Sequence, residues 1–173
     1  MKKRSRLFLV LLLCMVLPQM VLANLLTTKG EMDESQSFKT SFKHFKKVKF
    51  VSFVDSSSGP SKLHLYLLRD GDIVTVLPEF QTEVSSWSYE AMSAISFKDI
   101  DKDGLKDIIV MAYYVTGIGP TGMRPFLVKD IYFQTKEGFV KKKKVSKLLN
   151  DSKHYQKLKS IKNIVSFLQK RDN

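Results

Sequence analysis

Residues 94–115, AISFKDIDKDGLKDIIVMAYYV, decide the fold because they place an acidic loop between two apolar segments. The segments 94–97 and 108–111 contain isoleucine, valine and phenylalanine, which favour strands. Between them, four aspartates stand around a single glycine, Gly104. Neither flank has the period of a helix, so the stretch predicts a strand-loop-strand unit.

The apolar segments on both sides of this unit also have the composition and alternation of strands. Asp70-Gly71 is a strong signal for a two-residue hairpin turn. Strands are predicted within residues 47–55, 62–77, 107–115, 126–134 and 139–140.

The period changes after residue 140. Apolar residues now recur every three or four positions, which is the spacing of one helix face, at Leu158, Ile161, Val165 and Leu168. This pattern predicts one amphipathic helix from about Lys153 to Lys170. Its apolar stripe must be covered, because an isolated helix of this length is marginal in water. The predicted fold class is mainly antiparallel β, with blade-like sheets, followed by a C-terminal amphipathic helix, an α+β arrangement.

The aspartates have the spacing of a calcium loop. Hard cations bind six to eight oxygens, and carboxylates at alternate loop positions, with a glycine at the turn, supply most of them. The predicted ligands are four side chains and the carbonyl of the residue after Gly104: Asp99, Asp101, Asp103, Leu105 and Asp107. An EF-hand needs a glutamate at loop position 12, which is Val110 here. The alternative is an aspartate-rich turn whose carboxylates accept hydrogen bonds from backbone N–H groups and bind no ion.

The loop and its flanks resemble one repeat of the FG-GAP/VCBS family. The similarity covers residues 95–140: FKDIDKDGLKDIIV at 97–110, then Asp130-Ile-Tyr-Phe and Gly138-Phe-Val. In that family, the blades of integrin-type β-propellers bind calcium through a D-x-D-x-D-G-x-x-D loop. The resemblance implies Ca²⁺ as the bound ion and the same five ligands. Because the motif occurs once, a closed propeller is not expected.

The chain divides into four predicted segments. Residues 1–23 combine a basic start, an apolar run and Val21-Leu22-Ala23, which is the pattern of a cleaved signal peptide. Residues 24–46 have no steady period and are predicted to be a leader that wraps around the fold or hangs free. Residues 47–140 form the predicted β domain, and residues 141–173 a basic linker with the C-terminal helix. Export to the periplasm or outside the cell follows from the signal peptide.

Charge is distributed unevenly along the chain. Of the formal net charge of +12, residues 1–23 carry +4, residues 24–140 carry −1 and residues 141–173 carry +9. The basic run Lys141–Lys144 is interpreted as a handle for anionic envelope polymers or as a solvated helix face. Nucleic acid is not an expected partner of an exported chain, and any membrane contact is expected to be peripheral.

Enzymatic motifs are lacking. The only cysteine, Cys14, falls in the signal peptide, so thiol catalysis is excluded in the mature chain. The glycines at 117, 119 and 122 match G-x-G-x-x-G, but a strand follows instead of the helix that a dinucleotide site needs. The histidines have no zinc-site spacing. We therefore expect no enzyme, nucleotide or catalytic residue.

The sequence predicts an exported calcium-binding interaction module that presents neighbouring loops to a partner protein or polymer. The alternative is an inhibitor or immunity-type protein that blocks a cell-wall hydrolase with residues 117–125.

Overall fold

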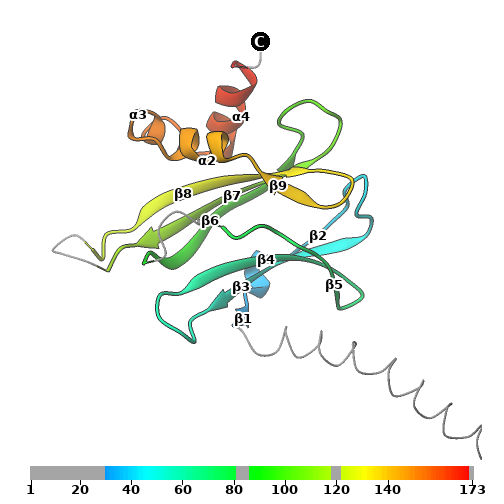
Figure 1. Cartoon of the computed structure of the whole chain (residues 1–173), viewed down its shortest axis with the longest axis horizontal. Helices are drawn as coiled ribbons and strands as arrows, with labels where there is room; N and C mark the ends of the chain where they lie inside the picture. The colour runs from blue at the N-terminus through cyan, green and yellow to red at the C-terminus, as the bar shows by residue number, and fades with distance from the viewer. Residues whose placement is uncertain (1–29, 81–85, 118–121, 172–173) are drawn as a thin grey trace, which may run out of the picture.

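The computed structural model describes residues 30–80, 86–117 and 122–171. They form three layers: two antiparallel β-sheets and a group of short helices that covers the outer face of the second sheet (Figure 1). The first sheet contains β1 (Glu31–Met32), β2 (Phe38–Thr40), β3 (Val48–Asp55), β4 (Lys62–Arg69) and β5 (Asp72–Val76), with a short 3₁₀ helix η1 (Glu34–Gln36) between β1 and β2. The second sheet contains β6 (Ser88–Lys98), β7 (Asp107–Val115), β8 (Phe126–Gln134) and β9 (Phe139–Lys141). The helices are α2 (Lys143–Asn150), α3 (Ser152–Tyr155) and α4 (Ile161–Gln169).

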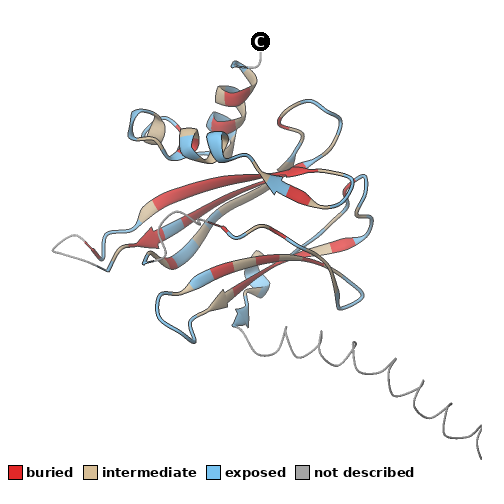
Figure 2. Ribbon diagram, in the orientation of Figure 1, coloured by how far each residue is buried: buried red, intermediate tan, exposed pale blue. Residues whose placement is uncertain are grey.

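Both sheets follow from the sequence pattern. In β4, Leu63, Leu65 and Leu67 are buried while the residues between them are less so, because alternate side chains of a strand point to opposite faces. In β7, nearly every residue is buried, since this strand lies between the first sheet and the helices (Figure 2). The expectation of mainly antiparallel β structure with C-terminal helical structure is confirmed.

Two hydrophobic clusters hold the layers together. The first lies between the sheets and includes Phe50, Leu67 and Tyr132; the second lies between the second sheet and the helices and includes Ile100 and Leu149. Because β7 and β8 contribute to both clusters, they are the central strands of the fold (Figure 2).

The segment predicted as a leader is part of the first sheet. In its described part, residues 30–46, β1 and β2 each pair antiparallel with β3, and Phe42 is 1% exposed in the core between the sheets. The boundary predicted at residue 47 therefore does not match the structure. The predicted signal peptide, residues 1–23, lies outside the described residues.

The prediction of a single helix from Lys153 to Lys170 is wrong. The chain leaves the helical conformation after α3, and α4 starts anew at Ser160, which has extended backbone angles and accepts the N–H of Asn163 on its Oγ. The linker expected before the helix is itself helical, as α2. The predicted stripe packs against the second sheet, with Leu158 and Leu168 buried. No helix in the three described ranges is long and apolar enough to cross a bilayer.

Candidate metal centre

The acidic loop connects β6 to β7, the first pair of strands in the second sheet. The two strands are in antiparallel register up to Lys98 and Asp107, so residues 99–106 must reverse the chain direction. Two residues of the loop have backbone angles in the left-handed region: Lys102 at φ 61° and Gly104 at φ 82°. Glycine adopts this region without the steric cost that a Cβ atom brings, which explains the glycine in the loop.

Ile100 anchors the loop to the core. Its side chain is 2% exposed and packs in the cluster between the second sheet and the helices. Because Ile100 is fixed, its neighbours Asp99 and Asp101 are held close to the start of β7. An apolar residue inside an acidic loop therefore positions two of the four aspartates.

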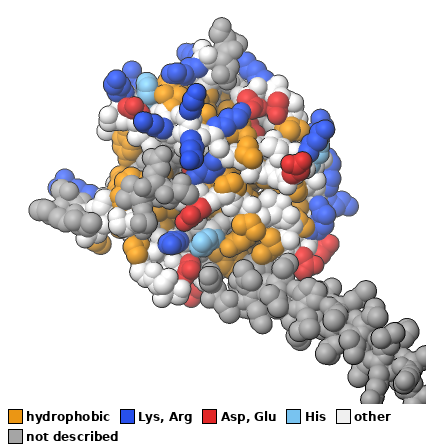
Figure 3. Space-filling view, viewed as in Figure 1, with side chains coloured by type: hydrophobic (Ala, Val, Ile, Leu, Met, Phe, Trp, Pro, Cys, Tyr) orange, Lys and Arg blue, Asp and Glu red, His pale blue; other side chains and the backbone are white. Residues whose placement is uncertain are grey.

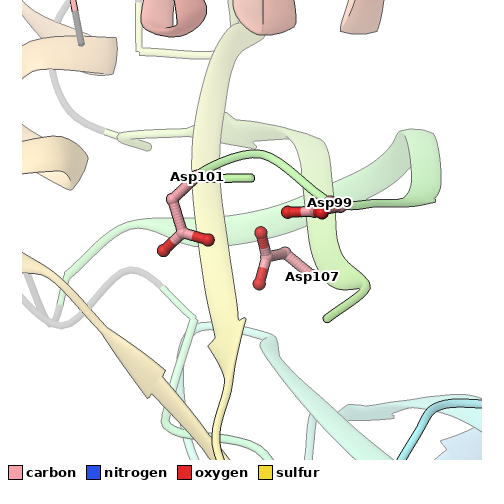
Figure 4. Close-up of side chains that lie close together, drawn as sticks. All are labelled: Asp99, Asp101 and Asp107. Carbon is pink, nitrogen blue, oxygen red and sulfur yellow. The ribbon is translucent and has the colours of Figure 1, made fainter. Parts of the chain in front are cut away.

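Three of the predicted ligands lie together. One carboxylate oxygen from each of Asp99, Asp101 and Asp107 falls within 4.8 Å of the other two, and the three side chains face one another (Figure 4). Two oxygens bound to one calcium ion at about 2.3–2.6 Å cannot be more than about 5 Å apart. The spacing of the three oxygens meets this limit.

Asp107 is the buried member of the group. Its side chain accepts the backbone N–H of Ile100 on Oδ2 at 2.9 Å and that of Gln134 on Oδ1 at 3.0 Å. Burial raises the pKa of Asp107 to about 6; these two hydrogen bonds oppose the shift, while the charges of Asp101 and Asp103 add to it. A cation beside Asp107 would compensate the cost of its buried charge.

Asp99 and Asp101 each have an oxygen without a partner. In the described part of the chain, three buried side-chain polar atoms make no hydrogen bond, and two of them are Oδ1 of Asp99 and Oδ1 of Asp101. A buried, unpaired carboxylate oxygen is costly. A hard cation that takes oxygen ligands would satisfy both atoms, so the residues present fit an ion of this kind.

The other two predicted ligands lie differently. Asp103 is exposed and is not part of the group; its Oδ1 accepts the N–H of Leu105 at 2.8 Å. Asp99 likewise accepts the N–H of Gly104 on Oδ2 at 3.0 Å. These bonds are those of the alternative, an aspartate-rich turn, but they leave Oδ1 of Asp99 and Oδ1 of Asp101 unused. Ligation by Asp103 and by the Leu105 carbonyl stays a prediction.

One residue of the site was not predicted. The Lys142 ammonium nitrogen lies 3.0 Å from Oδ2 of Asp101 and 3.8 Å from the centroid of the Phe133 ring. The sequence places Lys142 in a run of four lysines and carries no local sign of this contact, because Asp101 is 41 positions away. The pairing of β7 with β8 and of β8 with β9 brings the two residues together.

The structure describes only the two ends of the glycine-rich segment, residues 117–125. Residues 118–121, the middle of the G-x-G-x-x-G match and of the loop predicted to face a partner, lie outside the described residues. The N–H of Gly117 donates to the carbonyl of Gly122 at 2.9 Å. Among the described residues, the next element is the strand β8 and not the helix that a dinucleotide site needs.

No family model, curated protein or solved structure matches the chain. The resemblance to the FG-GAP/VCBS family thus depends on the sequence of residues 95–140 and stays a prediction. The chemistry of the site has to be inferred from the carboxylates, their burial and their partners.

Proposed function

We propose that this chain is an exported calcium-binding interaction module, similar to one VCBS repeat, that acts in the cell envelope or outside the cell. The observation that carries the proposal is the group formed by Asp99, Asp101 and Asp107, with two buried oxygens that no donor satisfies. The four-stranded order β6-β7-β8-β9 supports the resemblance, since a propeller blade is a four-stranded antiparallel sheet.

Calcium would act here as a structural ion. Asp107 starts β7 and accepts N–H groups from the acidic loop and from the end of β8, so its carboxylate already links three parts of the second sheet. An ion shared by Asp107, Asp99 and Asp101 would hold the β6–β7 loop against the start of β7. Because the three carboxylates lie together in the folded chain and not in the unfolded chain, calcium binding would stabilise the folded state.

The helical segment supplies a surface for an anionic partner. Lys and Arg side chains gather over the helices, at the top of Figure 3. The exposed ones, apart from Lys142, are Lys143, Lys144, Lys147, Lys153, Lys157, Lys159, Lys162, Lys170 and Arg171. A surface of this charge favours an anionic polymer of the envelope, held by long-range attraction that salt weakens.

Isothermal titration of the metal-free protein with calcium chloride tests the proposal. We expect one site with a dissociation constant of roughly 10⁻⁴ to 10⁻³ M, the range of extracellular modules. At a calcium concentration ten times this constant, binding adds about 1.4 kcal/mol to the free energy of unfolding, which raises the melting temperature by roughly 3–6 °C.

Two variants sharpen the test. Asp101→Asn removes a charge from the cluster and should weaken calcium binding at least about tenfold, since charge count sets affinity in such loops. Asp72→Asn removes the same charge at an exposed residue at the start of β5 and should bind like the parent. Magnesium should bind more weakly than calcium, because it keeps more of its water. If calcium gives no heat and does not change the melt, the loop is a turn without an ion.

A further inference from the structure

The ammonium of Lys142 lies at the edge of the acidic cluster formed by Asp99, Asp101 and Asp107. Its ammonium is fixed from two sides, by Oδ2 of Asp101 at 3.0 Å and by the face of the Phe133 ring at 3.8 Å. The Lys142 side chain is 49% exposed and that of Asp101 is 27% exposed, so the pair is accessible from solvent. A positive charge of the chain itself therefore neutralises part of the cluster.

Calcium and this ammonium compete for the same carboxylate. In Asp101 itself, Oδ1 makes no hydrogen bond, whereas Oδ2 is paired with the Lys142 ammonium. A calcium ion bound by Oδ1 of Asp101 would bring its double positive charge close to the Lys142 ammonium, which is held by Oδ2 of the same carboxylate. The repulsion weakens the ion pair between Lys142 and Asp101, and the ion pair weakens calcium binding by the same factor.

Lys142 lies directly before α2, so a change in its contact with Asp101 can reach the helices. Lys142 follows β9 directly and is the residue that precedes α2; its side chain makes no hydrogen bond to the first turn of that helix. Its neighbour Lys141 is held by the buried Asp130 at 2.6 Å, which fixes the chain up to that point. Loss of the contact between Lys142 and Asp101 would therefore leave the first turn of α2 less firmly held.

We propose that Lys142 is an internal counter-ion of the cluster which calcium displaces, so that calcium binding loosens the start of α2. The proposal rests on the proposed function, because it requires that the cluster binds calcium. It adds regulation to the site: a change at the β6–β7 loop is transmitted to the basic helical surface.

Lys142→Met tests the proposal, with Lys143→Met as the matched control. Both variants lose one positive charge at adjacent exposed positions, but of the two lysines it is Lys142 whose ammonium pairs with Asp101 of the cluster. An accessible ion pair changes a binding constant by about 1.4- to 5-fold. We therefore expect Lys142→Met to bind calcium chloride about 2- to 5-fold more tightly than Lys143→Met, and Lys142→Arg, which keeps the pair, to bind like the parent.

Hydrogen exchange gives a second readout that does not depend on affinity. Addition of calcium should speed amide exchange at Val145 and Ser146 in the parent protein, because both N–H groups donate to the carbonyl of Lys142 at the start of α2. In Lys142→Met these amides should exchange faster already without calcium and change little when it is added. Equal calcium affinity of the Met variants at 142 and 143, or exchange in α2 that calcium does not alter, would overturn the displacement proposal while calcium binding itself stands. If neither the parent nor any variant binds calcium, the proposed function and this inference both fail.

Discussion

Raising the pH from 7 to about 9.5 should stabilise the folded protein through Lys129. This lysine of β8 is fully buried; its ammonium donates to the carbonyl of Leu149 at 3.2 Å and lies 4.2 Å from the centroid of the Tyr155 ring. Burial first, and then the charge of Lys159, lower the pKa of Lys129 from 10.5 to about 8. The folded state thus loses this proton more readily than the unfolded state does.

The sign and size of the effect follow from proton linkage. Between pH 8 and 10.5 the unfolded chain binds more protons at Lys129 than the folded chain, so the free energy of unfolding increases with pH. Between pH 7 and 9.5 the gain is on the order of 2 kcal/mol, about 30-fold in the folding equilibrium. The window ends there because burial raises the pKa of Tyr89 to about 12, and stability from such tyrosines is lost above their ordinary pKa of 10.

Urea unfolding across this pH range, with a chelator present to keep the acidic loop free of metal, measures the gain. Lys129→Met keeps an unbranched apolar side chain at the position and should remove the increase. Lys162→Met changes an exposed lysine of α4 and should retain it. If the parent shows no increase, the Lys129 ammonium is not buried in solution; if Lys129→Met shows the same increase, another group titrates.

Three further predictions concern backbone geometry, the edge of β8 and the basic surface. Gly104→Val should lower the melting temperature even with calcium present, because φ 82° costs a residue with a side chain about 1–2 kcal/mol; an unchanged melt would contradict the loop geometry. Asn150→Ala should lower the free energy of unfolding by roughly 2 kcal/mol in urea titrations, because its amide pairs with both the N–H and the carbonyl of Lys129 at 3.0 and 2.8 Å; a change below about 0.5 kcal/mol would mean that water replaces it. Replacing Lys143 and Lys144 by Gln should reduce retention on an anionic matrix at low salt and leave the calcium-dependent melt unchanged; equal retention would assign these lysines to solubility.

The strands of the second sheet could be predicted closely from the sequence. The apolar runs predicted at 107–115 and 126–134 are β7 and β8, because continuous hydrophobic stretches bounded by turn residues have few alternatives to a buried strand. The strands β1 and β2 could not be predicted. They contain two and three residues, too few to show a period, and both pair with β3, along the edge that β4 does not occupy.

The sequence does contain a sign of the break between α3 and α4, but the regular apolar spacing across it suggested one continuous helix. Leu158 fits the stripe of α4 although it precedes that helix, since both lie against the same sheet face. Ser160, a residue type preferred at helix N-termini, marks where α4 begins. The spacing of apolar residues alone therefore predicted one helix where the structure has α3 and α4.

The proximity of three of the aspartates was predictable from the sequence, but their surroundings were not. Spacing around Gly104 grouped Asp99, Asp101 and Asp107, which lie together in the structure. It also included Asp103, which points its carboxylate at the Leu105 N–H. The contacts of Gln134 and Lys142 with the cluster depend on strand pairing across the sheet, which the spacing of a motif does not contain.

The most direct test of the central claim is a crystal structure grown in millimolar calcium, with anomalous scattering measured to locate the ion. We expect one anomalous peak about 2.3–2.6 Å from oxygens of Asp99, Asp101 and Asp107, with the Lys142 ammonium moved away from Asp101. A cluster without a peak, and with Lys142 still paired to Asp101, would contradict the claim that this chain binds calcium.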